Sequence, residues 1–175
     1  MQARKPSLRS DANGAAAAEL ALSLPLLLTL LFGAAEAGFY FYNEHQLIES
    51  LRDGGRYASR QSFIDYPCGG TINTTTEANI KKVIRTGSAT GTVNRIPLIE
   101  DSDITISYTC IDELETMPAS TSFVPLGGIY EAAGEGAVLT ISATVTYQSL
   151  FGFEYGFPSG GININAVQQA PVTGI

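Results

Sequence analysis

Hydrophobic and polar positions follow three different patterns along this chain, and each pattern predicts a different kind of element. From Ala15 to Phe41 almost every residue is apolar, and the only charged side chains are Glu19 and Glu36. As a helix these 27 residues would rise about 40 Å at about 1.5 Å per residue. A hydrocarbon core about 30 Å thick needs about 20 apolar residues. The run therefore predicts one membrane-spanning helix with a carboxylate near each end.

Beyond the apolar run, the pattern becomes that of a helix with one apolar face. Its members recur at i, i+4, i+7 and i+11, and they are Leu47, Leu51, Gly54 and Ala58. This spacing is typical of an amphipathic α-helix. We therefore expect one helical unit over residues 15–62 that continues past the membrane. The Gly54-Gly55 pair indicates either a hinge or a place where the following domain packs closely, because each glycine costs a helix interior about 1 kcal/mol.

Strict alternation of apolar and polar residues appears after residue 63. Asp103–Cys110 and Val138–Tyr147 alternate with a period of two, which predicts half-buried strands. We expect these two strands to pair in an antiparallel sheet. Thr92–Leu98 and Ile162–Val167 are weaker strand candidates. The aromatic stretch Leu150–Phe157 is either a loop that covers the core or an exposed contact patch, and the core is the preferred interpretation.

A short helix is expected before the strands. Thr74 and Glu77 have the spacing of a capping box, and Gly87 supplies a stop signal ten residues after Glu77. The apolar stripe between them consists of Ile80, Val83 and Ile84. Residues 63–175 are therefore predicted to form one small antiparallel β-rich domain, so the fold class is α+β with a long N-terminal helix.

Charges around the apolar run predict its orientation. Arg4, Lys5 and Arg9 precede it, and basic flanks stay on the cytoplasmic side. Residues 63–175 would then lie outside the membrane. The aromatic residues 39–42 are expected to form a band where the helix leaves the bilayer.

A cleaved signal peptide is the alternative. A basic start, an apolar stretch and the A-x-A pattern Ala35-Glu36-Ala37 also fit secretory processing after Ala37. Two features favour a retained span instead. Glu19 lies at the start of the apolar stretch, where a signal peptide does not require an acidic residue. The apolar run also continues past Ala37 to Tyr42.

The stretch from Gly14 to Gly38 resembles the TadE-like family of the tight-adherence (Flp) pilus system. The matching positions in it are Glu19, Pro25, Gly33, Glu36 and Gly38. The likeness continues through Gln46–Ala58, which is similar to that family's helical tail. Gly14 followed by four alanines and Glu19 also looks like the processing site of type IV-like prepilins. There, the leader is cut after the glycine, and the acidic residue becomes the fifth of the mature chain.

The resemblance implies roles for individual residues. Gly14 and Ala15 would flank the cut that removes a leader of residues 1–14, and Glu19, Pro25 and Glu36 would serve assembly and register. A free amine on Ala15, of the same or a neighbouring subunit, would reduce the cost of burying the Glu19 carboxylate. Pro25 lacks an N–H and should kink or locally open the helix near residue 21, and Ser23 is close enough to help satisfy the freed carbonyl.

Cys68 and Cys110 are the only two cysteines. In an oxidising compartment outside the membrane they are expected to form a disulfide, and two free thiols are the alternative. Such a bridge would close a loop of about 40 residues, worth about 4 kcal/mol in the chain-entropy model.

Candidate catalytic and metal-binding groups are sparse in the sequence. The single histidine, His45, has no second histidine or cysteine nearby, and no Gly-rich phosphate loop follows a strand. Acidic clusters at 100–103 and 112–115 lack the spacing of a calcium loop. Loss of residues 1–14 removes three basic side chains and one acidic one, so the net charge moves from −7 to −9. We therefore expect no enzyme activity, no metal, no cofactor and no nucleic-acid partner.

These observations predict a minor pilin or pseudopilin that serves assembly of a Tad/Flp-type pilus. The resemblance implies its partners: a prepilin peptidase, other pilin-like subunits and the pilus assembly platform. It would be a single-pass protein of the bacterial inner membrane. The alternative is a secreted or surface binding module released by signal peptidase after Ala37.

Overall fold

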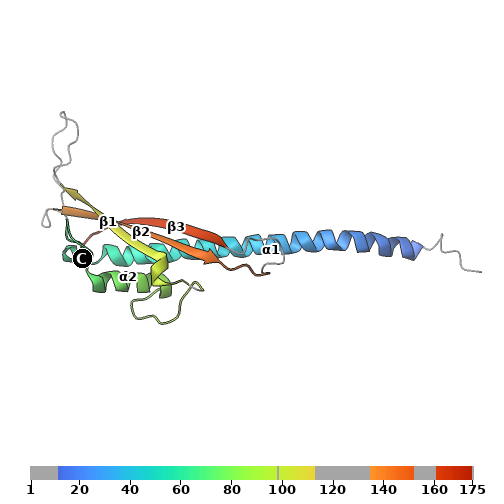
Figure 1. Cartoon of the computed structure of the whole chain (residues 1–175), viewed down its shortest axis with the longest axis horizontal. Helices are drawn as coiled ribbons and strands as arrows, with labels where there is room; N and C mark the ends of the chain where they lie inside the picture. Colours follow the sequence, from blue (N-terminus) through green and yellow to red (C-terminus); the bar gives the residue numbers. More distant parts are fainter. Residues whose placement is uncertain (1–11, 98, 113–134, 152–160, 175) are drawn as a thin grey trace, which may run out of the picture.

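The computed structural model describes residues 12–97, 99–112, 135–151 and 161–174. Its elements, in chain order, are α1 (Ala12–Ser59), η1 (Phe63–Asp65), α2 (Thr74–Thr86), η2 (Asp101–Asp103), β1 (Ile104–Asp112), β2 (Glu135–Tyr147) and β3 (Ile162–Pro171). A long helix runs the length of the molecule, and the sheet and α2 pack on its C-terminal half (Figure 1). The predicted α+β class is confirmed.

The three strands form an antiparallel sheet in the order β1-β2-β3. Ala143 in the middle of β2 is flanked by Ile104 of β1 and Ala166 of β3. The predicted pairing of the two best strand candidates is therefore confirmed, and the weaker candidate Ile162–Val167 is part of β3. The candidate Thr92–Leu98 is wrong over residues 92–97, which contain bends and a turn and no strand, and Leu98 lies outside the described residues.

One face of the sheet is packed and the other is open. Inward-facing Leu139, Ile141 and Val145 of β2 are 0–4% exposed, and both β2 and β3 contact α1. Threonine, serine and asparagine occupy the alternate positions, such as exposed Thr144 and Asn165. The period-two pattern arises because successive side chains of a strand point to opposite faces.

Helix α2 has the predicted apolar stripe but a different first residue. Its N-cap is Asn73, whose side chain accepts a hydrogen bond from the Thr75 backbone N–H, so the expected cap at Thr74 was one residue late. Gly87 ends the helix in the left-handed region with φ 80°, a conformation that glycine adopts at little cost. The buried side of α2 faces α1.

Helix α1 continues without interruption through Gly54 and Gly55. A Cβ built on Gly54 would fall on the side chain of Ile84 in α2, and one on Gly55 would contact Ala170 and Gln168 of β3. Both glycines are buried. Of the two interpretations of this pair, close packing is correct, and the two glycines let α2 and β3 approach α1 from two sides.

The N-terminal half of α1 projects beyond the domain (Figure 1). An 18-residue window in it has a mean hydropathy of 2.0, and none of that window is buried. Exposed leucines such as Leu22 and Leu30 are 81% and 63% accessible. By length and composition, this is a helix that can cross a membrane. Of the aromatic stretch 150–157, only Leu150 and Phe151 lie within the described residues, so its expected role stays a prediction.

Candidate functional site

The uncovered part of α1 carries the residues expected at the processing site. The helix begins at Ala12, so Gly14 and Ala15 lie in its first turn, and both are exposed together with Glu19. Nothing lies within 4 Å of a Cβ built on Gly14. In the described residues, Glu19 makes no ion pair. A peptidase and a neighbouring subunit would therefore both find these groups accessible.

Pro25 lies inside α1 without ending it. The Ser23 hydroxyl donates to the Leu20 carbonyl at 3.3 Å, and the Thr29 hydroxyl donates to the Pro25 carbonyl at 2.8 Å. The carbonyl of residue 21, which loses its partner at a proline, is not the acceptor of Ser23. Helix α1 is continuous from Ala12 to Ser59, and a kink or local opening at Pro25 stays a prediction.

Glu36 marks the point where the domain begins to cover α1. It is 5% exposed, whereas Ala35 and Ala37 on either side are exposed. From Ala15 to Ala35, a segment of 21 residues, no side chain is buried, and this length corresponds to about 32 Å of helix at about 1.5 Å per residue. That length matches a hydrocarbon core of about 30 Å. A span that ended near Glu36 would be shorter than the run to Phe41 expected from hydropathy, and the position of its end stays a prediction.

The Glu36 carboxylate is held by the end of β2 and the turn that follows. The Tyr147 hydroxyl donates to its Oε1 at 2.7 Å, and the Leu150 backbone N–H lies 3.2 and 3.1 Å from Oε1 and Oε2. The Ser149 side chain and the Phe151 backbone donate to it as well. We call Glu36, Tyr147 and residues 149–151 the junction.

All donors at the junction are neutral. In the described part of the chain, no lysine or arginine pairs with Glu36. Several hydrogen bonds to a buried carboxylate replace the water it loses, and hydrogen bonds to a charged group are worth about 1.5–3 kcal/mol each. Burial, and then the neighbouring Glu36 carboxylate, raises the pKa of the Tyr147 phenol above its usual range, so this hydroxyl remains a donor. The junction therefore fixes the domain to α1 through hydrogen bonds.

The aromatic residues after Glu36 divide between two environments. Phe39 and Tyr40 pack against the Tyr147 ring, with centroids 6.0 and 5.3 Å away. Phe41 and Tyr42 point away from the domain and are 64% and 57% exposed. The expected band of interfacial aromatics stays a prediction, and two of its four members, Phe39 and Tyr40, are half-buried against the domain.

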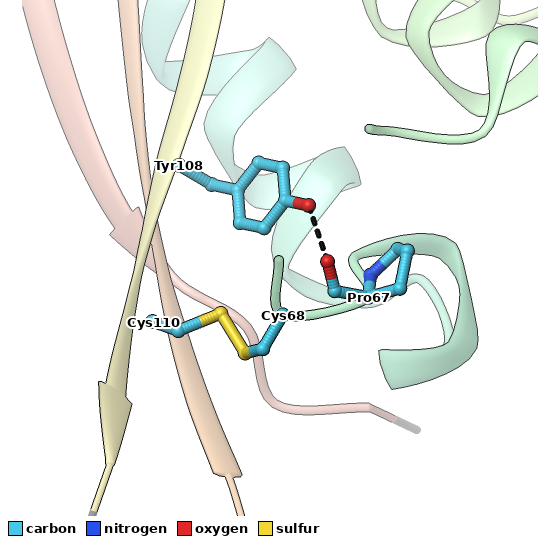
Figure 2. Close-up of a disulfide and its surroundings, with 4 residues drawn as sticks. All are labelled: Pro67, Cys68, Tyr108 and Cys110. Carbon is cyan, nitrogen blue, oxygen red and sulfur yellow. Dashed lines mark hydrogen bonds between the residues drawn. A yellow bond between two sulfur atoms is a disulfide. The ribbon is translucent and has the colours of Figure 1, made fainter. Parts of the chain in front are cut away.

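A disulfide closes the opposite end of the domain. Cys68 and Cys110 are bonded, with Cα atoms 5.8 Å apart and a sequence separation of 42. Figure 2 shows that the bond joins the loop after η1 to β1, and that Tyr108, two residues earlier on the same strand, points to the same loop. Its hydroxyl donates to the Pro67 carbonyl at 2.6 Å. The predicted pairing is confirmed.

The end of α1 is fixed to the same region. The Tyr66 hydroxyl donates to the Ala58 carbonyl at 2.9 Å. Thr173 donates to the Ser59 carbonyl through its backbone N–H at 2.7 Å and its hydroxyl at 2.8 Å. Carbonyls that the last helical turn leaves without partners are thereby satisfied. The domain is attached to α1 at both ends, near Glu36 and near Ser59.

The remaining charged candidates serve local structure. His45 pairs with Glu49 one turn away, Arg95 reaches Asp53 at 2.7 Å, and Arg85 pairs with Asp101. Asp103 accepts from the Glu100 backbone N–H at the start of η2. No group of three or more potential metal ligands occurs among the residues described. Most of the second acidic cluster, at 113–115, lies outside the described residues.

Comparison with known proteins adds one finding. Residues 14–56 match the family model described as TadE-like protein. This confirms the resemblance seen in the sequence for the anchor segment, about a quarter of the chain, and indicates involvement with the Tad pilus system. Families of this kind are not enzymatic in general. No curated protein matches the chain, and no solved structure matches it.

The TadE-like segment contains only half of the junction. Gly14, Glu19, Pro25 and Glu36 lie inside the matched residues, but the groups that bind the Glu36 carboxylate are more than 100 residues further along the chain. Sequence analysis did not find them. The sequence does show that Tyr147 ends an alternating strand and that Leu150 and Phe151 follow shortly after it, but this pattern does not indicate that Glu36 is the partner.

Proposed function

We propose that this chain is a membrane-anchored minor pilin or pseudopilin of a Tad/Flp-type pilus, processed by a prepilin peptidase after Gly14. The observation that carries the proposal is the abrupt change along α1 at Glu36. Residues 14–35 project from the domain with no buried side chain, and they coincide with the part of the TadE-like segment before Glu36. A subunit of this kind needs an apolar helix that can first lie in a membrane and later be covered by neighbouring subunits.

The processing site supports the same proposal. A cut after Gly14 frees the amine of Ala15 within one turn of Glu19. An ammonium group there offsets the cost of a carboxylate at the edge of the hydrocarbon region, which reaches a few kcal/mol on insertion scales. Exposure of Gly14 and Glu19 leaves this pair open to a neighbouring subunit. The partners proposed are the peptidase, other pilin-like subunits and the assembly platform.

Orientation follows from the basic residues before α1. Arg4, Lys5 and Arg9 place the N-terminus in the cytoplasm, and the domain then lies outside the inner membrane. The Cys68–Cys110 disulfide supports that placement, because such bonds persist in oxidising compartments.

Release by signal peptidase after Ala37 is the alternative, and the junction disfavours it. That cut would remove Glu36 from the buried site formed by Tyr147 and the turn after it. Hydroxyl and backbone N–H donors would then be left without their acceptor, at about 1–3 kcal/mol for each buried group. The bond also lies in the middle of continuous helix α1.

The mature N-terminus distinguishes the two. N-terminal sequencing of the protein purified from membranes should begin at Ala15, whereas a start at Gly38 supports the released module. Gly14→Trp should block removal of the leader, so the variant should remain heavier by 14 residues and stay in the membrane. Gly33→Trp, elsewhere on the uncovered helix, is the matched control and should be processed normally.

A further inference from the structure

We propose that the turn after β2 is a second membrane contact, in which Leu150 and Phe151 enter the lipid interface beside α1. The inference deepens the proposed function, because it requires α1 to span the bilayer as far as Glu36. The partner is the lipid bilayer itself, at the boundary between hydrocarbon and headgroups.

The backbone of the turn is held at the depth of Glu36. The Leu150 N–H bonds both carboxylate oxygens of Glu36, at 3.2 and 3.1 Å. Glu36 is the first buried residue of α1 in the described part of the chain, so the turn lies where, in the proposed arrangement, the helix leaves the hydrocarbon core. Its height relative to the membrane is therefore set by a hydrogen-bonded site.

Phe151 extends from this turn toward the bilayer. Its ring lies 5.0 Å from the ring of Phe32, centroid to centroid, at an interplanar angle of 58°. Phe32 precedes Glu36 by four residues, which is one helical turn or about 6 Å nearer the hydrocarbon centre. A side chain of the domain thus reaches below the level of the junction carboxylate and packs on the spanning segment itself.

Leu150 is apolar and 52% exposed although its backbone is fixed. A single exposed leucine is ordinary on a soluble surface. Here, it adjoins Phe151 and the uncovered apolar helix, and residues 147–151 contain no charged side chain. Continuity with the spanning segment, together with the absence of charge, fits the lipid interface and not open water.

The opposite side of α1 carries a matching pair. Phe41 and Tyr42 are exposed and lie five and six residues beyond Glu36, about 8 to 9 Å along the helix. This is close to the polar zone of the bilayer, which adds roughly 5–8 Å on each side of the hydrocarbon, where aromatic side chains gather. Apolar groups on both sides of α1, near the point where it would leave the hydrocarbon core, would limit tilt and rotation of the domain. A single spanning helix does not limit them in this way.

The chain contains no tryptophan, so a single introduced one reports its own depth. Three full-length variants, Leu150→Trp, Leu27→Trp and Ile64→Trp, would be reconstituted in phosphatidylcholine–phosphatidylglycerol vesicles with brominated acyl chains. Leu27 is in the proposed span and 59% exposed, and Ile64 is 86% exposed beyond the far end of α1. From Glu36 to Ser59, the helix rises about 35 Å at about 1.5 Å per residue.

We expect strong bromine quenching for Leu27→Trp, intermediate quenching with blue-shifted emission for Leu150→Trp, and no quenching for Ile64→Trp. Quenching of Leu150→Trp as weak as that of Ile64→Trp, with Leu27→Trp strongly quenched, would overturn the second contact and leave the span intact. No quenching of Leu27→Trp would overturn both. In each variant, circular dichroism checks that the domain is folded, and resistance to alkylation without reductant checks that Cys68 and Cys110 are paired.

Discussion

The Tyr147 hydroxyl donates a 2.7 Å hydrogen bond to the Glu36 carboxylate across 111 residues of sequence. One partner lies where the apolar helix ends, and the other is the last residue of the central strand. The bond joins the apolar part of α1 directly to the sheet. A force or a tilt applied to α1 is therefore transmitted to the domain through a buried polar contact.

Removing either the Tyr147 hydroxyl or the Glu36 carboxylate should destabilise the domain. We expect Tyr147→Phe to lower the free energy of unfolding by about 1.5–3 kcal/mol, because a hydrogen bond to a buried charge is lost. Glu36→Gln should cost a similar amount, since its amide group places hydrogens opposite the junction's donors. Denaturant unfolding of the full chain in detergent, followed by circular dichroism, measures both.

A double-mutant cycle separates this pair from its surroundings. If Tyr147 and Glu36 act through one bond, the double variant should cost clearly less than the sum of the two single changes. Glu49→Gln, on the exposed face of the same helix, is the control and should change stability by about 0.5 kcal/mol or less. Additive costs at the junction would mean that the bond contributes nothing specific.

Elements with a periodic signal were predictable, and the junction was not. The apolar run, the face through Leu47 and Leu51, and the two alternating stretches each reveal which side of an element is buried. Hydrogen bonds between distant residues leave no such period. The family resemblance implied a role in assembly and register for Glu36, and that role stays a prediction. The structure shows that the Glu36 carboxylate binds groups of its own domain.

The wrong strand at Thr92–Leu98 has a similar cause. Its backbone groups are satisfied locally, since the Arg95 N–H donates to the Arg85 carbonyl at 2.7 Å. The Asn94 side chain reaches the Ile99 carbonyl at 3.1 Å. A short stretch with one buried apolar residue, Ile96, can meet the alternation rule without a neighbouring strand to pair with.

The close approach at Gly54 predicts opposite effects for two glycines of α1. Gly54→Ala should destabilise the domain by about 1–3 kcal/mol, because its Cβ would collide with Ile84 and force repacking. Gly38→Ala, which has nothing within 4 Å, should leave stability unchanged or raise it by up to about 1 kcal/mol through helix propensity. Thermal unfolding of both variants gives the comparison.

A second change tests the cause. Ile84→Ala removes the atoms that an alanine at position 54 would meet, at the cost of a cavity. Combined with Gly54→Ala, it should be less damaging than the two costs added together. If the costs of Gly54→Ala and Ile84→Ala are fully additive, the effect of Gly54→Ala does not arise from its contact with α2.

The disulfide should contribute both stability and a marker of compartment. Cys68→Ala with Cys110→Ala should lower stability by about 2–4 kcal/mol, since the unfolded chain loses a closed loop. In the native wild type, both cysteines should resist alkylation until a reductant is added, and Cys68→Ala alone should expose a reactive Cys110. Ready alkylation of both cysteines in untreated cells would contradict the placement of the domain outside the inner membrane.

Glu19 provides the most direct test of assembly. An unpaired carboxylate near the hydrocarbon region costs about 2.5–3.5 kcal/mol at most on insertion scales, so Glu19→Ala should insert at least as well as wild type. Leader removal should persist, because Gly14 is unchanged. What should be lost is the pairing with the amine of Ala15 in the same or an adjacent subunit. The variant should therefore accumulate in the membrane while surface pili decrease.

Glu19→Gln distinguishes charge from shape. Glutamine keeps the size of the side chain but cannot form an ion pair with an ammonium group, so it should not restore pili. Glu49→Gln, which removes an exposed charge from the same helix beyond the membrane, should assemble normally. Quantifying pili by electron microscopy and sheared-fraction immunoblots decides the matter: wild-type levels in both Glu19 variants would show that this carboxylate has no part in assembly, and that its place in the anchor needs another explanation.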